Sequence, residues 1–392
     1  MKHLPALPRI AAAIAALACA AAASASDLSA SLVKALEGTQ APAIAALSMR
    51  GGKVVDEGVA GVRRNDQPGA AMLADPWLIG SDAKPMTATL VARLVDRGLL
   101  SWSTPLAKLL PDLAAGMRPE YRDVTLLQLL SHHAGLPHDT ADIPFFNTFF
   151  ADTRPLSAQR LAYLAKALAE APVGPPGKQF EYSNTGFIVA AAVAERAANA
   201  SYEELMRKEV FEPLGMAHVQ FGTTHEGQPL GHLKGVPAKA ADANPLMFAP
   251  AGNVSLPLRD WAAFCLDQMA GAHEHGKLLA PATYRQMQTA QPGGGSAGLG
   301  WGLQASLAGH AGPVLMHAGS DGNWYAIVAL FPATESGVLA VANAGEEMDG
   351  LLHGVHSVGS DASICHKLFN ATYGVGQPGI KAAGPSSRCG WP

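Results

Sequence analysis

Ser81 and Lys84 are the residues of this chain whose types and spacing best suit covalent chemistry. A serine hydroxyl is a weak nucleophile until a neighbouring base takes its proton. A lysine amine can be that base when burial or nearby positive charge lowers its pKa. Residues three positions apart share one helix face, and the apolar run after Gly80 predicts a helix that begins at the serine and stops at Gly98. Amides at its start would also face a developing oxyanion.

Two other serines lie in patterns that imitate a nucleophile. Ser31 has a lysine three positions later, Lys34, but that copy lies inside a predicted surface helix with no strand or glycine before it. Ser296 lies in a G-x-S-x-G pattern, whose nucleophile elbow requires a strand before and a helix after the serine. Here a Pro-Gly pair precedes the pattern and a strand-like segment follows it. Ser81 is therefore the preferred nucleophile.

Two later segments carry residues that could complete the site. Tyr182 is followed two positions later by Asn184, and a phenol can relay the serine proton to a leaving group if a nearby ammonium lowers its pKa. His317 ends a predicted strand and is followed by Gly319, so the strand could offer a backbone N–H to the substrate oxygen. Taken singly, Tyr182 also fits a half-buried structural tyrosine, and His317 a structural histidine.

The order of these segments, S-x-x-K, then Y-x-N, then H-x-G, resembles the class C-like branch of the serine β-lactamase and penicillin-binding-protein superfamily. The resemblance covers about residues 30–345. Four further segments are similar to that branch: 129–137 (LLSHHAGLP), 213–216 (PLGM), 250–260 (beginning PAGN) and 298–302 (GLGWG).

This resemblance implies a role for each candidate. Ser81 would be the acylated nucleophile, Lys84 the general base and Tyr182 the proton relay. Asn184 would hydrogen-bond the substrate or Lys84. The oxyanion hole would consist of the backbone N–H groups of Ser81 and Ser320. The implied reaction is acyl transfer to water in two steps, through an acyl-enzyme.

The third motif departs from the family pattern. His317 stands where the family's K-T-G has lysine, and Ala318 stands in place of threonine. A histidine is mostly neutral at pH 7 and alanine has no hydroxyl, so recognition of a substrate carboxylate is weakened. We therefore expect a carboxylesterase or D-amino-acid peptidase, with a β-lactamase as the alternative. A non-catalytic protein that binds cell-wall fragments or a partner is an alternative of another class, and a fluorophosphonate would discriminate it.

The surrounding elements predict an α/β (α+β) fold similar to the β-lactamase/transpeptidase fold. An antiparallel sheet flanked by helices would form from about residues 26–104 and 255–392, and an all-helical lobe from about 105–254, with the site in the cleft between them. The predicted strands are 43–49, 53–60, 77–80, 298–303, 314–317, 324–331 and 337–343. The predicted helices are 27–37, 81–98, 124–130, 158–168, 186–197, 202–211 and 349–369.

The N-terminus is typical of a secretory signal peptide. Lys2 and Arg9 form a positive segment, residues 10–23 are apolar, and small residues up to Ala25 suit a signal peptidase. We therefore expect residues 1–25 to be removed by cleavage near Ala25, leaving one hydrolase domain over 26–392, secreted or periplasmic. The apolar stretch is too short to span a bilayer comfortably.

Composition limits the partners. The chain has 392 residues, 48% of them hydrophobic, and a formal net charge of −4, which gives no basic surface for nucleic acid. We expect a small-molecule or peptidoglycan-type substrate, no cofactor and no stable membrane span. His132, His133 and His138 suggest a zinc site, but adjacent histidines diverge and no H-E-x-x-H is present, so no metal is expected. The oligomeric state stays open.

Two further features are left with alternatives. Cys365 and Cys389 could form a disulfide in an oxidising compartment, while Cys265 fits a buried small hydrophobe. The aromatic run 145–150 fits either ordinary packing or an apolar wall for an acyl group, and in the second case Phe149 would favour longer-chain esters.

Overall fold

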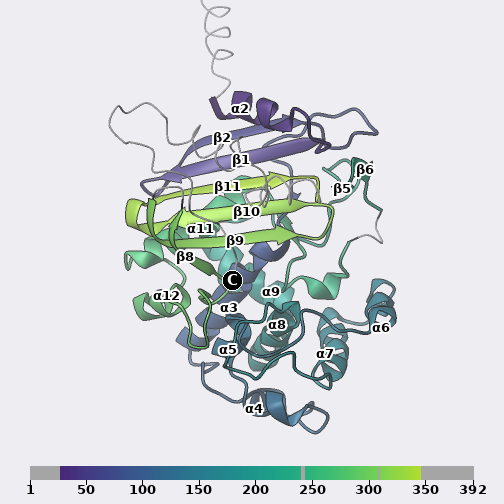
Figure 1. Cartoon of the computed structure of the whole chain (residues 1–392), viewed down its shortest axis with the longest axis vertical. Helices are drawn as coiled ribbons and strands as arrows, with labels where there is room; N and C mark the ends of the chain where they lie inside the picture. The colour runs from purple at the N-terminus through teal and green to yellow at the C-terminus, as the bar shows by residue number, and fades with distance from the viewer. Residues whose placement is uncertain (1–26, 240–242, 308–309, 346–392) are drawn as a thin grey trace, which may run out of the picture.

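The computed structural model describes residues 27–239, 243–307 and 310–345 (Figure 1). The predicted signal peptide, the predicted helix 349–369 and the proposed Cys365–Cys389 pair lie outside these residues. Within the described part of the chain, no helix is long and apolar enough to cross a membrane.

A six-stranded antiparallel sheet joins the two ends of the described chain, as predicted. Its strand order is β2-β1-β11-β10-β9-β8. β1 pairs with β11, so that Ile44 lies opposite Ala342, and the Ala43 amide donates to Asn343 Oδ1 at 2.7 Å. The strands are β1 (Ala43–Arg50), β2 (Lys53–Gly61), β8 (Gly302–Leu307), β9 (His310–Ser320), β10 (Tyr325–Phe331) and β11 (Ser336–Ala342).

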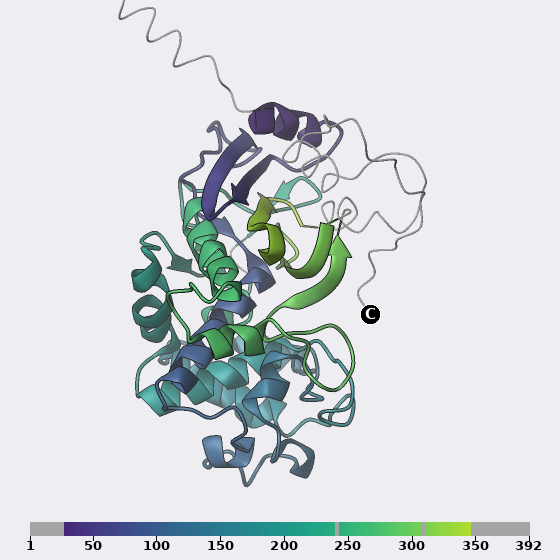
Figure 2. The same ribbon diagram turned by 90° about the vertical axis from the view of Figure 1, so that its left-hand side faces the viewer.

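Each face of this sheet is covered by helix (Figure 2). Because successive side chains of a strand point to opposite faces, Ile44 packs with Leu28 and Leu32 of α2 (Asp27–Leu36). Leu47 belongs to the large core on the other face, which α11 (Leu258–Ala272) shares. Cys265 of α11 is fully buried, as predicted for a small hydrophobe, and forms no disulfide within the described part of the chain.

The helices of the middle segment gather on one side of the sheet, around the buried helix α3 (Figure 1). α3 and α8 contact each other, and both contribute buried apolar residues to the same core. The helices are α3 (Lys84–Asp96), α4 (Leu106–Leu109), α5 (Leu126–Leu130), α6 (Ile143–Asn147), α7 (Leu156–Ala167), α8 (Asn184–Ala198), α9 (Tyr202–Met206), α10 (Glu212–Leu214) and α12 (Pro281–Met287). The 3₁₀ turns are η1 (Gly80–Ala83), η2 (Pro119–Tyr121), η3 (Thr148–Phe150), η6 (Leu246–Phe248) and η7 (Pro332–Thr334).

Short strands accompany the helices of this segment. β4 (Gln220–Phe221) joins β3 (Trp77–Leu78) and β7 (Val254–Leu256) in a three-stranded sheet. β5 (His232–Leu233) and β6 (Val236–Pro237) form a two-stranded hairpin.

Several predicted elements have other bounds in the structure, and two of these differences have a clear local form. The strand expected over 298–303 begins only at Gly302, because Gly300 adopts a positive φ of 74° and its amide donates to Leu130 O at 2.8 Å. The helix expected over 202–211 ends as α9 at Met206 and continues as a π turn, Arg207–Phe211. A π turn keeps backbone hydrogen bonds while it changes the helical register, so periodicity alone did not reveal it.

Candidate active site

Ser81 lies at the point where β3 passes into helix. Gly80 takes a left-handed conformation, with φ of 51°, that a side chain would strain. Ser81 follows in the 3₁₀ turn η1, and α3 begins at Lys84 rather than at the serine. The i,i+3 spacing brings the two side chains together, with Lys84 Nζ 2.8 Å from Ser81 Oγ.

The Lys84 amine is enclosed by protein. The residue has no exposed surface, and Nζ donates to Ala251 O at 2.5 Å. Nζ also lies 4.9 Å from the centre of the Tyr182 ring and 5.7 Å from that of Phe187. Burial lowers the pKa of Lys84 to about 7, against the opposing attraction of Asp139 and Asp82. The amine can therefore lose its proton at neutral pH, which a general base requires.

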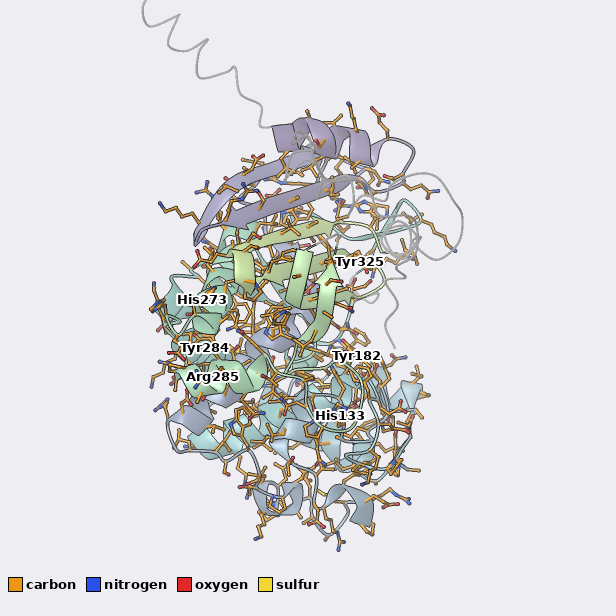
Figure 3. All side chains as sticks on the ribbon, turned by 60° about the vertical axis from the view of Figure 1, so that its left-hand side comes forward. His133, Tyr182, His273, Tyr284, Arg285 and Tyr325 are labelled. Atoms are coloured by element: carbon orange, nitrogen blue, oxygen red, sulfur yellow. The ribbon has the colours of Figure 1, made fainter. Side chains whose placement is uncertain are left out.

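Tyr182 meets the same pair from the helical side. It lies just before α8, between the sheet and the helical part (Figure 3). Burial raises the pKa of Tyr182 above its usual value, and a hydrogen bond with Ser81 only partly opposes this. The expected lowering of the Tyr182 pKa by a nearby ammonium is thus wrong, because burial of the phenol has the larger effect and raises that pKa. Tyr182 remains a protonated phenol at neutral pH and can donate.

The strand β9 contacts η1 through backbone. A Cβ at Gly319 would lie 2.6 Å from the Ser81 nitrogen, and a Cβ at Gly80 would lie 2.5 Å from the Ser320 nitrogen. Side chains are therefore excluded at both positions, and the backbone nitrogens of Ser81 and Ser320 meet at one junction. Two amides beside a nucleophile are the groups from which an oxyanion hole is built.

His317 stands behind this junction as an uncharged ring. Its Nδ1 donates to Ala318 O at 2.9 Å, and burial, followed by repulsion from Lys84, lowers its pKa to about 3. Asp82 Oδ1 lies 3.8 Å from the same nitrogen. Neither Asp82 oxygen has a hydrogen-bond partner among the described residues, and burial raises the pKa of this carboxyl. His317 therefore cannot supply the positive charge of the lysine it replaces.

A cavity of about 250 Å³ opens onto Ser81. The charged side chains of its lining are acidic, Asp139 and Asp321, and the described residues bring no Lys or Arg to it. Burial raises the pKa of Asp321 to about 6, so it is ionised above that pH. The lining also includes Asn184 and Ser320, the apolar Ile143, Phe146, Phe248, Ala251 and Gly252, and the polar His138, Thr140 and Asn244.

Asn184 reaches this cavity but does not hydrogen-bond Lys84. Its amide donates to the two Asp139 oxygens at 3.2 and 3.1 Å, and His138 Nδ1 bonds the same carboxylate at 2.5 Å. Sequence reasoning missed Asp139, although it comes shortly after the LLSHHAGLP segment. It also missed the Ala251 carbonyl, which lies inside the quoted PAGN segment.

The aromatic run 145–150 serves both packing and the cavity wall. Phe146 lines the cavity at Ser81 and packs edge-on against Phe248, with ring centres 5.6 Å apart. Phe149 is buried, packs against Phe145 and lines a neighbouring cavity. Phe146 therefore belongs to the cavity at the serine, whereas Phe149 lines the neighbouring one.

The three clustered histidines make separate contacts. His132 Nδ1 accepts the Ser183 amide at 3.0 Å, and the His133 ring bonds Ser131 Oγ and Gly294 O. The part of the chain that the structure describes holds no group of three or more potential metal ligands. The rival serines lie elsewhere: Ser31 is on α2, where its companion Lys34 is exposed, and Ser296 is in a loop with no helix after it.

Comparison with known proteins identifies the family. The family model described as Beta-lactamase matches residues 29–354, which is most of the chain. This chain therefore belongs to the β-lactamase family, and the resemblance stated from its motifs is confirmed.

Two curated relatives are similar over two thirds of the chain. Penicillin-binding protein 4 of Amycolatopsis lactamdurans is 29% identical over 282 residues, 67% of this chain and 70% of that protein. The D-alanyl-D-alanine-carboxypeptidase/endopeptidase AmpH of Escherichia coli K12 is 25% identical over 275 residues, 67% and 69% of the two chains.

Solved structures confirm the predicted fold class. The octameric penicillin-binding protein homologue from Pyrococcus abyssi has a TM-score of 0.67 at 21% identity, over 81% of this chain and 73% of that one. A D-stereospecific amidohydrolase from Streptomyces sp. has a TM-score of 0.67 at 21% identity, over 88% and 98%.

The pH dependence of activity should follow Lys84. Because the base is the uncharged amine, kcat/KM should rise as pH rises through about 7, the lowered pKa of Lys84. The measurement is kcat/KM for an uncharged ester between pH 5 and 9. Asp321 titrates nearby, at about 6, so Asp321→Asn is the control. If the rise of kcat/KM with pH disappears in Asp321→Asn, the titrating group is that carboxyl and not Lys84.

Replacing Gly319 by alanine should separate β9 from η1. The new Cβ would meet the Ser81 nitrogen, and loss of one oxyanion donor costs about 100-fold or more in kcat. Gly116→Ala is the control, since its Cβ would have no atom closer than 3.9 Å. Turnover of an activated ester measures both variants, and wild-type kcat in Gly319→Ala would argue against this oxyanion hole.

Proposed function

We propose that this protein is a serine hydrolase that transfers an acyl group from an ester or amide to Ser81 and then to water. The observation that carries the proposal is the buried Lys84 amine 2.8 Å from Ser81 Oγ, with a pKa lowered to about 7. A buried amine without a catalytic task would more simply be an apolar side chain, because burying an ionisable group costs free energy. The membership of the β-lactamase family supports the same reaction.

In the acylation step, Lys84 takes the proton of Ser81 as Oγ bonds the carbonyl carbon. The carbonyl electron pair moves onto oxygen, and the amides of Ser81 and Ser320 stabilise that oxyanion. The carbon–leaving-group bond then breaks. The leaving group takes the proton of the Tyr182 phenol, and the Lys84 ammonium restores that proton.

Deacylation reverses the proton path. Water gives a proton to Lys84 and bonds the acyl carbon. Ser81 Oγ leaves with the proton that Tyr182 or Lys84 returns. Because Tyr182 and Lys84 both contact Ser81 Oγ, one short path serves both steps, and the balance is one water consumed for each acyl group released.

The charges of the cavity favour a substrate whose acyl part carries an ammonium group. Asp139 and Asp321 offer two carboxylates, and His317 is uncharged, so a substrate carboxylate would meet repulsion. The activity that we propose first is therefore that of a D-amino-acid amidase or peptidase whose substrate carries a free amine. The printed descriptions of a D-alanyl-D-alanine-carboxypeptidase and a D-stereospecific amidohydrolase among the similar proteins support D-amino-acid substrates.

A carboxylesterase is the second candidate. Ile143, Phe146 and Phe248 form an apolar side of the same cavity, which suits an uncharged acyl group. A β-lactamase is less favoured, because the anionic group of a β-lactam would face two carboxylates. We also propose that the chain is exported after removal of residues 1–25, and that the sheet and helical lobes predicted from the sequence form one hydrolase unit.

Substitution of the proposed nucleophile tests the reaction class. Ser81→Ala should abolish turnover of ester and amide substrates while the melting temperature stays within a few degrees of wild type. A fluorophosphonate should add its mass to the wild-type protein and not to Ser81→Ala, since it reacts with an activated serine. Ser31→Ala is the matched control and should retain labelling and turnover. Labelling that persists in Ser81→Ala would exclude the proposed nucleophile.

A matched pair of substrates tests the charge preference. D-alanine p-nitroanilide should be hydrolysed with a kcat/KM at least about tenfold above its N-succinyl derivative, the ratio that 1.4 kcal/mol of differential binding gives. Asp139→Asn should reduce this ratio several-fold, because it removes one carboxylate and retains a similar shape. Asp152→Asn, a carboxyl outside this cavity, should leave the ratio unchanged. Preference for the succinyl substrate would contradict the proposal.

A further inference from the structure

His132 is held in an unusual backbone conformation next to the site. It follows α5, within the LLSHHAGLP segment, and has a φ of 62°. Residues other than glycine seldom adopt this region, and a non-glycine residue held there is a reason to look for a functional constraint. The side chain is buried, with 6% of its surface exposed.

His132 contacts Tyr182 and both of its neighbours in the chain. Its carbonyl accepts the Glu181 amide at 2.7 Å, and its Nδ1 accepts the Ser183 amide at 3.0 Å. The imidazole also stacks on the phenol ring, with ring centres 4.4 Å apart and an angle of 24° between the planes. One residue therefore holds the backbone before and after Tyr182 as well as the ring itself.

The segment around Tyr182 is held on its C-terminal side by Ser183 Oγ, which donates to Pro137 O at 2.6 Å, and by the Asn184 amide, which donates to His138 O at 2.9 Å. Residues 180–183 belong to no helix or strand, so no ladder of backbone hydrogen bonds fixes them. The phenol, however, must remain within hydrogen-bonding distance of Ser81 if it is to pass a proton. The contacts of His132 add to these anchors a bond to the residue before the tyrosine and a stacked ring against the phenol itself.

The His132 ring is suited to this position because it is uncharged. Burial, followed by repulsion from Lys84, lowers the pKa of His132 well below its usual value. Because Nδ1 accepts the Ser183 amide, the ring proton lies on Nε2. A neutral ring leaves the proton balance between Lys84 and Tyr182 undisturbed.

We propose that His132 is a positioning residue for Tyr182: its left-handed backbone, its Nδ1 and its stacked ring together hold the phenol against Ser81. The inference rests on the proposed function, since it assigns His132 an effect on turnover through Tyr182.

Two variants separate the contributions of His132. His132→Asn retains an acceptor near the Nδ1 position and tolerates the left-handed backbone, but loses the ring. His132→Phe retains a ring but loses the acceptor. Each should lower kcat by about tenfold or more, because a displacement of 1 Å can cost about 100-fold, and should change KM by less than about threefold.

The decisive measurement is a double-mutant cycle with Tyr182→Phe. If His132 acts through the phenol, each His132 substitution should change kcat less than about threefold once that hydroxyl is absent. The rate of fluorophosphonate labelling should follow the same pattern. His133→Gln is the matched control: its ring bonds Ser131 Oγ and Gly294 O and packs edge-on against Phe180, not against the phenol. Its effect on kcat should therefore be the same with and without the Tyr182 hydroxyl.

Three outcomes would overturn the inference. They are an unchanged kcat in both His132 variants, an equal loss with and without the Tyr182 hydroxyl, or failure of both variants to fold, which would make His132 a residue of global stability. These results are distinct from failure of the proposed function, which Ser81→Ala reports. If Ser81→Ala is inactive and the cycle is additive, only the assignment of His132 is wrong.

Discussion

The removal of the Lys84 amine from water is the physical condition on which this site depends. In water the amine would hold its proton far above neutral pH, and it could not accept one from Ser81. Here the rings of Tyr182 and Phe187 and the Ala251 carbonyl enclose Nζ, so that the uncharged form becomes accessible near pH 7. The same burial has the opposite effect on Tyr182, because a phenol is uncharged when protonated. One dry environment therefore prepares a base and an acid side by side.

The sequence was informative where local geometry decides the outcome. The i,i+3 spacing of Ser81 and Lys84 and the glycine before them were sufficient to expect a contact, and the structure gives that contact. Short apolar runs joined by Gly- or Asn-containing connections predicted β1, β2, β10 and β11 within one or two residues. The start of β8 was misplaced, because the turn at Gly300 is stabilised by Leu130, a residue far away in the sequence.

What the sequence could not supply depends on tertiary enclosure. The sequence does not reveal that the Asp82 carboxyl is buried, because an aspartate on the surface would be the same letter in the same pattern. The importance of Asp139 comes from the cavity that it shares with Asn184 and Ser81, and that cavity forms only in the folded chain. The raised pKa of Tyr182 was likewise unpredictable, because its direction depends on whether burial or a neighbouring ammonium has the larger effect. His317 was recognised as an exception to the family's lysine, but its neutrality required knowledge of its surroundings.

The pairing of β1 with β11 has a consequence for how the molecule is made. Residues 43 and 343 must find each other across almost the whole described chain, and such long-range contacts slow folding, because loop closure costs entropy before the contact stabilises anything. The amide of Ser320 is also absent until late in synthesis. A nascent chain that already contains the nucleophile therefore lacks the strand that completes its surroundings, and hydrolytic competence should emerge only with the fully assembled sheet.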